Sequence, residues 1–274
     1  MIVNKAEARE DGLRDDLRAD TLKLLTFWAM RFVLPLVSGR RLLVIGAHSA
    51  DFVWRAGGAI AVCTGAGGEA QVVALSYGER GESGELWKEP DQTLENVKRV
   101  RHGEAERAAA HLGASFRALD LGDYPLEIDA EALLRVADVI REFAPDVVVT
   151  HTDTDPFNPD HPVAHRAVDR ARSLAAGAGV PSSFGTIRPP QLFLFEPHQP
   201  ELCNFTPTTF VDITTVIERK AAAMAEMKAQ AYLQTYYRER ADHRGNHARR
   251  ASGDQSVRQA EAFQRVIPQV VSEL

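Results

Sequence analysis

The chain has 274 residues, of which 45% are hydrophobic and 26% are charged, the ordinary balance of a globular protein. Its formal net charge of −6 argues against binding to nucleic acid or to anionic membranes, so we expect neither partner. The two cysteines, Cys63 and Cys203, form no C-x-x-C pattern and are typical of a reducing compartment. We therefore expect a cytoplasmic protein whose fold does not depend on disulfides.

An apolar run, LLTFWAMRFVLPLV, lies near residues 24–37. It is too short to span a bilayer, and a secretory signal would not contain the acidic stretch that precedes it. We interpret residues 1–38 as an amphipathic helical extension that packs either on the following domain or on a second subunit. The second alternative predicts a homo-oligomer.

From residue 39 onward, short apolar runs typical of buried strands alternate with helical patterns. The expected strands are residues 41–48, 71–78, 115–122, 146–151, 191–198 and 208–214, and the expected helices are residues 52–67, 94–114, 129–145, 161–179 and 218–240. Strands that are apolar on both faces indicate a sheet covered on both sides. The pattern predicts one α/β domain over residues 39–274, Rossmann-like, with a mostly parallel sheet between two layers of helices.

Side chains that can carry chemistry gather just after the predicted strands. In open α/β sheets ligands bind at the carboxyl ends of the strands. Each histidine taken alone is more often a surface or capping residue, but several strand ends with the same residue types indicate one site. In chain order these residues are His48 and Asp51; Glu79, Arg80 and Glu82; His151, Asp153, Asp155, Asp160, His161 and His165; and Glu196 and His198.

A metal site is the chemistry that this pattern favours. His48 and Asp51 are three residues apart where a strand turns into a helix, so both side chains can face one point. A third ligand from a distant strand end completes the set that a catalytic zinc site uses. We therefore expect one divalent metal ion and favour zinc, although nitrogen and oxygen ligands also suit iron or manganese.

Two segments carry a resemblance to a known family. Residues 47–52 read AHSADF and are followed by Gly57-Gly58, and residues 158–161 read NPDH. They resemble the A-H-P-D-D-E and H-P-D-H motifs of the PIG-L/LmbE-like superfamily of zinc N-deacetylases. The resemblance implies the fold of that superfamily, and it implies that His48, Asp51 and His161 are the metal ligands.

Two positions depart from the family pattern. Ala50 replaces the aspartate that serves those deacetylases as general base, and an alanine cannot accept a proton. Asn158 replaces the first histidine of H-P-D-H and can donate a hydrogen bond but cannot act as an acid. Loss of a general base typically lowers a rate by about 10²–10⁴. The sequence therefore predicts a retained metal site without the usual deacetylation machinery.

A narrower resemblance accounts for these departures. The string AHSADFVWRAGG is similar to the divergent branch of the superfamily that contains 4-oxalomesaconate hydratase, an enzyme of gallate breakdown. The resemblance implies that the metal site serves the addition of water to a carbon–carbon double bond. The expected substrate is a small polycarboxylate, 4-oxalomesaconate, and the product is 4-carboxy-4-hydroxy-2-oxoadipate.

Conjugate hydration needs a base to activate water, an acid to protonate carbon, and a Lewis acid for the developing enolate. Because Ala50 is inert, the base and the acid have to come from elsewhere. Our candidates are Glu82 and His198, with Glu79 and Glu196 as competitors, and their division into base and acid stays open at this stage.

Arginine is the natural partner for substrate carboxylates because its planar fork binds them with two hydrogen bonds. We expect Arg55 first and Arg244 second in this role, with Asn158 as a further substrate contact. Two other functions remain as alternatives. One is a zinc N-deacetylase of an amino sugar or small amide with a relocated base, and the other is a non-catalytic family member that keeps the metal.

Overall fold

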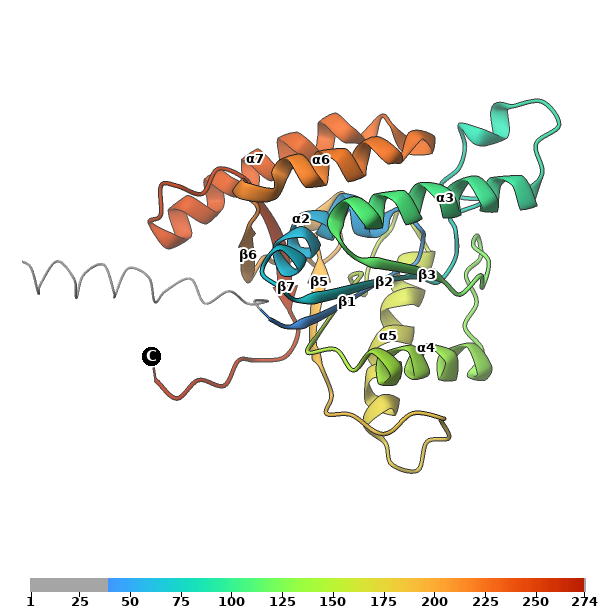
Figure 1. The fold of residues 1–274 in the computed structure, drawn as a ribbon, viewed down its shortest axis with the longest axis horizontal. Helices are drawn as coiled ribbons and strands as arrows, with labels where there is room; N and C mark the ends of the chain where they lie inside the picture. The colour runs from blue at the N-terminus through green and yellow to red at the C-terminus, as the bar shows by residue number, and fades with distance from the viewer. Residues whose placement is uncertain (1–38, 274) are drawn as a thin grey trace, which may run out of the picture. The chain divides into compact units, whose positions relative to one another are not determined.

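The computed structural model describes residues 39–273, and the predicted extension over residues 1–38 lies outside them. The described part is built around a seven-stranded sheet in the order β3-β2-β1-β4-β5-β7-β6 (Figure 1). Strands β1 to β5 run parallel, and β7 and β6 are antiparallel. The strands are β1 (Arg41–Gly46), β2 (Glu69–Ala74), β3 (Ser115–Ala118), β4 (Val147–Thr150), β5 (Gln191–Phe195), β6 (Thr209–Asp212) and β7 (Ala260–Arg265). This confirms the predicted mostly parallel α/β fold.

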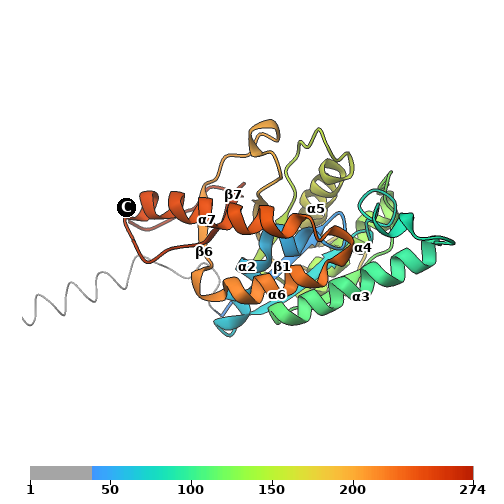
Figure 2. The ribbon, with the colours of Figure 1, turned by 90° about the horizontal axis from the view of Figure 1, so that it is seen from above.

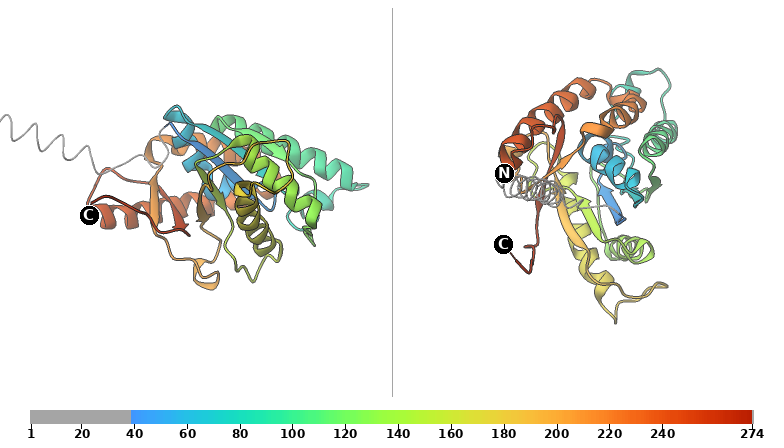
Figure 3. Two further views of the ribbon diagram at one scale, coloured as in Figure 1. Left: turned by 90° about the horizontal axis from the view of Figure 1, so that it is seen from below. Right: turned by 60° about the vertical axis from the view of Figure 1, so that its left-hand side comes forward.

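Helices cover both faces of the sheet. One layer holds α2 (Asp51–Gly65), α3 (Leu94–Leu112), α6 (Ile217–Glu226) and α7 (Leu233–Ser252), and α6 packs on both α2 and α3 (Figure 2). The other layer is formed by α4 (Ala130–Phe143) and α5 (Asp160–Ala176), which pack on each other and lie in front when the molecule is seen from below (Figure 3). The two layers are the ones expected from the alternating pattern.

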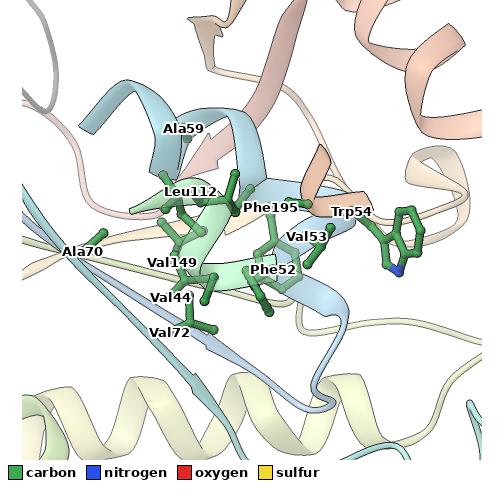
Figure 4. Packing of buried hydrophobic residues seen from close by; sticks show 14 of the residues in the cluster. Val44, Phe52, Val53, Trp54, Ala59, Ala70, Val72, Leu112, Val149 and Phe195 are labelled. Carbon is green, nitrogen blue, oxygen red and sulfur yellow. The ribbon is translucent and has the colours of Figure 1, made fainter. Parts of the chain in front are cut away.

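Alternation along β1 divides the core between the two layers. Leu42 and Val44 belong to the cluster that includes Phe52 of α2 (Figure 4), whereas Leu43 and Ile45 belong to the cluster on the α4 and α5 side. Successive side chains of a strand point to opposite faces, so one short apolar run serves both cores. The central strand is thereby fixed from both sides, and the carboxyl end that follows it starts from a rigid position.

One expectation about the carboxyl-terminal third is corrected, and one strand there had not been predicted. The helix predicted over residues 218–240 is interrupted, because α6 ends at Glu226 and a 3-10 turn, Lys228–Gln230, precedes α7. Ala229 and Gln230 are buried in that turn and bond to Glu104 and to other side chains, so tertiary contacts override the helical periodicity. The strand β7, formed by the segment that contains AEAF, was not predicted as a strand.

No helix among residues 39–273 combines the length and the apolarity needed to cross a membrane. Cys63 and Cys203 are both buried and free of disulfides in the described structure.

Candidate metal centre

The turn between β1 and α2 sets the positions of His48 and Asp51. The backbone N–H of His48 donates to Oδ2 of Asp51 over 2.8 Å, which closes the turn. A Cβ atom added to Gly46 would lie 2.9 Å from Cβ of Asp51, so a glycine at the end of β1 lets the first turn of α2 come this close. The two candidate ligands of the first motif are therefore fixed locally, by the strand end and the start of the helix.

Four side chains converge at this point. His48, Asp51, Glu82 and His161 each place one ligand atom within 4.8 Å of all the others. His48 Nδ1 lies 3.2 Å from Glu82 Oε1, and His161 Nε2 lies 3.6 Å from Asp51 Oδ1. Ligands at about 2.0–2.1 Å from a tetrahedral zinc ion are about 3.4 Å apart. The cluster therefore has the dimensions of a coordination shell for one ion.

Carboxylates set the tautomers of both histidines. His48 Nε2 lies 3.2 Å from Asp160 Oδ2, and His161 Nδ1 lies 2.8 Å from Asp155 Oδ2. In a neutral ring the carboxylate accepts the N–H and the other nitrogen keeps a lone pair that can bind a metal. Burial lowers the pKa of His48, but Glu82, Asp160 and Asp51 raise it well above its ordinary value, so a cation that binds at Nδ1 would replace a proton there. Asp155 and Asp160 thus prepare the two rings to bind a cation.

The two free nitrogens give the clearest sign of a metal. His48 Nδ1 and His161 Nε2 are buried and lack a hydrogen-bond partner within residues 39–273, and both lie in the cluster. Leaving a buried polar atom unpaired costs about 1–3 kcal/mol, so two at one point need an explanation. A divalent cation accounts for both, and the residues present fit such an ion.

Asp51 is linked to Arg55 through His151. Nε2 of His151 lies 3.0 Å from Asp51 Oδ2, and Arg55 Nη1 lies 3.3 Å from Nδ1 of the same ring. Burial alone would raise the pKa of Asp51, but the neighbouring His151, His161 and Arg55 hold this pKa well below its ordinary value. Asp51 is therefore an ionised carboxylate. His151 is stacked on His161, with ring centroids 4.0 Å apart.

Glu82 is the fourth member of the cluster, and two amides bind it. Asn158 Nδ2 donates to Oε1 over 3.2 Å, and Gln230 Nε2 donates to Oε2 over 3.4 Å. Burial would raise the pKa of Glu82, but His48 outweighs it and lowers this pKa below the ordinary value. An ionised carboxylate therefore lies beside the candidate ligands. Asn158, expected to contact the substrate, donates its amide to this carboxylate.

His198 lies in the segment after β5. Tyr237 Oη is 3.4 Å from His198 Nδ1, and the His198 carbonyl accepts hydrogen bonds from Tyr236 Oη and Arg240 Nη2, both at 2.6 Å. Burial lowers the pKa of His198 to about 4, helped by the positive charge of Arg55. The ring is therefore neutral near pH 7 and is held at its backbone and at Nδ1.

The two predicted arginines have different surroundings. Arg55 is buried, and its Nε has no hydrogen-bond partner among the described residues. Arg244 Nε donates to Glu196 Oε2 over 2.9 Å, and its Nη1 lies 2.9 Å from His247 Nδ1. Arg244 is thus engaged with protein groups, and the expectation that it binds substrate stays an untested prediction.

Glu79 and Glu196, the other two candidates for the base and the acid, are bound to other groups of the protein. Glu196 pairs with Arg244 and lies 3.3 Å from Arg240. Glu79 accepts the backbone N–H of Tyr77 over 3.0 Å, and neither carboxylate belongs to the candidate metal cluster.

Sequence reasoning missed several residues that orient the site. Asp155, Asp160 and His151 were named only as members of a strand-end group, although an acidic residue near a ligand histidine is the signal that would have found the first two. Gln230 and Tyr237 lie in a helical segment with no chemical motif, and only the tertiary structure places them at the site.

Ala50 is the residue at which the first motif departs from the family pattern. It is the residue before α2, is fully buried and provides no side-chain hydrogen bond to the helix. The position that would carry a base in the deacetylase motif therefore presents a methyl group, while Glu82 brings a carboxylate from another strand end.

Comparisons with known proteins agree with this geometry. Residues 43–172 match the family model of PIG-L, described as GlcNAc-PI de-N-acetylase. A curated relative from Pseudomonas putida KT2440, named 4-oxalmesaconate hydratase, is 46% identical over 235 residues, which cover 85% of this chain and 91% of the relative. A curated 1D-myo-inositol 2-acetamido-2-deoxy-alpha-D-glucopyranoside deacetylase from Thermomonospora curvata is 32% identical over 170 residues, 53% of this chain and 57% of the relative.

Solved structures give the same order of similarity. The crystal structure of GalB, the 4-carboxy-2-hydroxymuconate hydratase from Pseudomonas putida KT2440, matches with a TM-score of 0.83 and 44% identity, covering 86% of this chain and 99% of that one. The N,N'-diacetylchitobiose deacetylase from Pyrococcus horikoshii matches in fold, with a TM-score of 0.70, 20% identity and coverage of 90% and 92%. The chain therefore belongs to the PIG-L family, and within that family it is more similar to the hydratase than to the deacetylases.

Proposed function

We propose that this protein is a metal-dependent hydratase that adds water to the carbon–carbon double bond of 4-oxalomesaconate and forms 4-carboxy-4-hydroxy-2-oxoadipate. The observation that carries the proposal is the cluster of His48, Asp51 and His161, in which Glu82 brings a further carboxylate to within 3.2 Å of His48. The 46% identity to the Pseudomonas putida hydratase over 91% of its length supports the same reaction.

His48, Asp51 and His161 would hold one divalent ion, and we favour zinc. The two unpaired ring nitrogens and the ionised Asp51 are the donor types that zinc prefers. When bound, such an ion supplies Lewis acidity that stabilises negative charge developing on a substrate oxygen.

Glu82 is the base in this proposal, and His198 is the acid. The ionised Glu82 faces the cluster with Oε1, where it can take a proton from the attacking water. Water contributes a hydroxyl group to one carbon, and His198 delivers a proton to the neighbouring carbon of the former double bond. His198 is neutral in the free protein, and the carboxylates of a bound substrate raise its pKa, because negative charge favours the imidazolium.

Arg55 is the proposed partner of a substrate carboxylate. Its guanidinium is buried beside the cluster, with Nη2 4.0 Å from Asp51 Oδ1, and its Nε has no partner in residues 39–273, so one donor of the planar fork is unused. Arg244 is the second candidate from the sequence. We also infer a cytoplasmic location from the free cysteines, and the homo-oligomer stays a prediction tied to residues 1–38.

The test is a hydration assay on purified protein of known metal content. We expect one divalent ion per chain and a loss of the ultraviolet absorbance of 4-oxalomesaconate as its conjugated double bond is hydrated. Unchanged absorbance with fully metal-loaded protein would reject the proposal. Release of acetate from N-acetylated amino sugars by the same preparation would instead support the deacetylase alternative, and metal binding with neither reaction would support the non-catalytic one.

A further inference from the structure

The two oxygens of Glu82 have different tasks. Oε1 lies 3.2 Å from His48 Nδ1 and 3.8 Å from His161 Nε2, so this oxygen belongs to the candidate metal cluster. Oε2 is the oxygen that Gln230 binds, over 3.4 Å. Oε1 also accepts a hydrogen bond from Asn158 Nδ2 over 3.2 Å, so the carboxylate is held at both oxygens, and Gln230 is its partner at Oε2.

The orientation of the Gln230 amide is fixed by two donors. Its Oε1 accepts from Trp54 Nε1 over 3.3 Å and from Arg101 Nη2 over 3.2 Å. Indole and guanidinium nitrogens only donate, so the amide oxygen has to face them. The NH₂ group is left to face Glu82, and a flipped amide would lose both donors.

A second set of contacts fixes Gln230 as a whole. Arg101 is fully buried, and its Nη1 donates to Glu104 Oε2 over 2.9 Å. The other oxygen of Glu104 accepts the backbone N–H of Ala229, the residue before Gln230, over 3.0 Å. Glu104 on α3 therefore holds both the guanidinium that orients the amide and the backbone that carries it. This network lies at the point where the helix is interrupted between α6 and α7.

We propose that Gln230 is a positioning residue that holds Glu82 through Oε2 and thereby presents Oε1 to the metal cluster. Its catalytic consequence rests on the proposed hydratase function, but its geometric role does not. Gln230 acts only through Glu82, with Asn158 as the second amide that restrains the same carboxylate.

The exchange Gln230→Met tests the proposal because methionine has similar length and no N–H donor. We expect kcat to fall about 10- to 100-fold, because a reacting group displaced by about 1 Å loses this much rate, with KM changed less than threefold. Gln259→Met is the matched control, since the side chain of Gln259 bonds to the exposed Asp242. It should keep the kcat of the original protein.

A double-mutant cycle separates positioning from general scaffolding. In a Glu82→Ala background, Gln230→Met should cause no further loss of activity, because the residue through which it acts is gone. An equal loss in both backgrounds would overturn the proposal. A Gln230→Met variant with the same kcat as the unsubstituted protein would also overturn the proposal.

The visible spectrum of protein loaded with Co²⁺ tests the geometry without any activity. Because Glu82 Oε1 lies 3.2 Å from His48 Nδ1 and shares the cluster with the proposed ligands, Gln230→Met should change the ligand-field bands, and the change should vanish in the Glu82→Ala background. An unchanged spectrum in the single variant would overturn the positioning role even if the hydratase is active, whereas a changed spectrum in an inactive protein would reject only the proposed function. If Gln230→Met does not fold, Gln230→Glu can replace it. This variant keeps the shape of the side chain and an oxygen that accepts from Trp54 and Arg101, but it lacks the NH₂ group that donates to Glu82. The same changes in kcat and in the Co²⁺ spectrum are then expected.

Discussion

Two regions contribute side chains to the candidate site, and they differ in whether the family model matches them. The ligand region follows β1 and β4, contains His48, Asp51 and His161, and lies wholly within residues 43–172, the part that matches the PIG-L family model. The cover region, α6 to α7, lies beyond that match and holds Gln230 and Tyr237 against Glu82 and His198. The candidate ligands therefore lie in the part of the chain that matches the family model, whereas two side chains that contact Glu82 and His198 come from a segment beyond it.

The largest effect should come from removing a ligand. His161→Ala takes away one of the two unpaired nitrogens, so we expect loss of the bound metal and a fall in kcat/KM of about 10³-fold or more. Elemental analysis and the hydration assay measure the two quantities. His111→Ala is the control, because this histidine is exposed and pairs with Glu226. A His161→Ala variant that stays active and fully loaded would place the metal elsewhere.

The second largest loss of activity should come from removing the proposed base, Glu82. Glu82→Gln keeps the shape of the side chain but cannot accept a proton, so we expect kcat to fall about 10²–10⁴-fold while the metal stays bound. The matched exchange Glu79→Gln should leave kcat within a few-fold of the original, because Glu79 lies outside the cluster. If Glu79→Gln lowers kcat more than Glu82→Gln does, Glu82 is not the base.

The candidate ligands could be named from the sequence because each lies in a short segment that resembles a motif of the family. His48 and Asp51 share one turn, and the spacing of residues 158–161 places His161 at the first turn of α5. The alternation of apolar runs and helical patterns likewise sufficed to predict a mostly parallel sheet, although it did not give the order of the strands. Gln230 could not be predicted, because its role depends on Arg101 and Glu104 of α3, more than a hundred residues away.

His198 should matter less than Glu82 but more than the residues around it. His198→Asn removes the proposed acid, and we expect kcat to fall about 10²-fold with metal content unchanged. Single-turnover measurements would show whether the chemical step has slowed. An unaltered rate would remove His198 from the mechanism.

His198 should also affect how the free energy of unfolding depends on pH in acidic solution. Burial holds the pKa of His198 to about 4, below the ordinary value near 6.5, so between these values the unfolded chain binds a proton that the folded chain does not. Folding stability therefore falls as pH is lowered from about 6.5 to 4. His198→Asn should lose less stability across this window than the original protein. Urea unfolding at several pH values measures the difference, and equal pH dependence would contradict the assignment.

The smallest effect on turnover should come from Arg244. Arg244→Met breaks the pair with the buried Glu196, so we expect a loss of about 3 kcal/mol in the free energy of unfolding with little change in KM. Arg55→Met should raise KM at least tenfold, because it removes the unused Nε donor, and it also removes the contact between Nη1 and His151. A large rise in KM for Arg244→Met would restore it as a substrate ligand.

The most direct test of the ligand region is anomalous diffraction from crystals of metal-loaded protein, recorded on both sides of the zinc absorption edge. We expect one strong peak between His48 Nδ1, His161 Nε2 and the Asp51 carboxylate, at about 2.0–2.2 Å from each. A peak at any other place in the protein, or fully active crystals with no peak, would contradict the account.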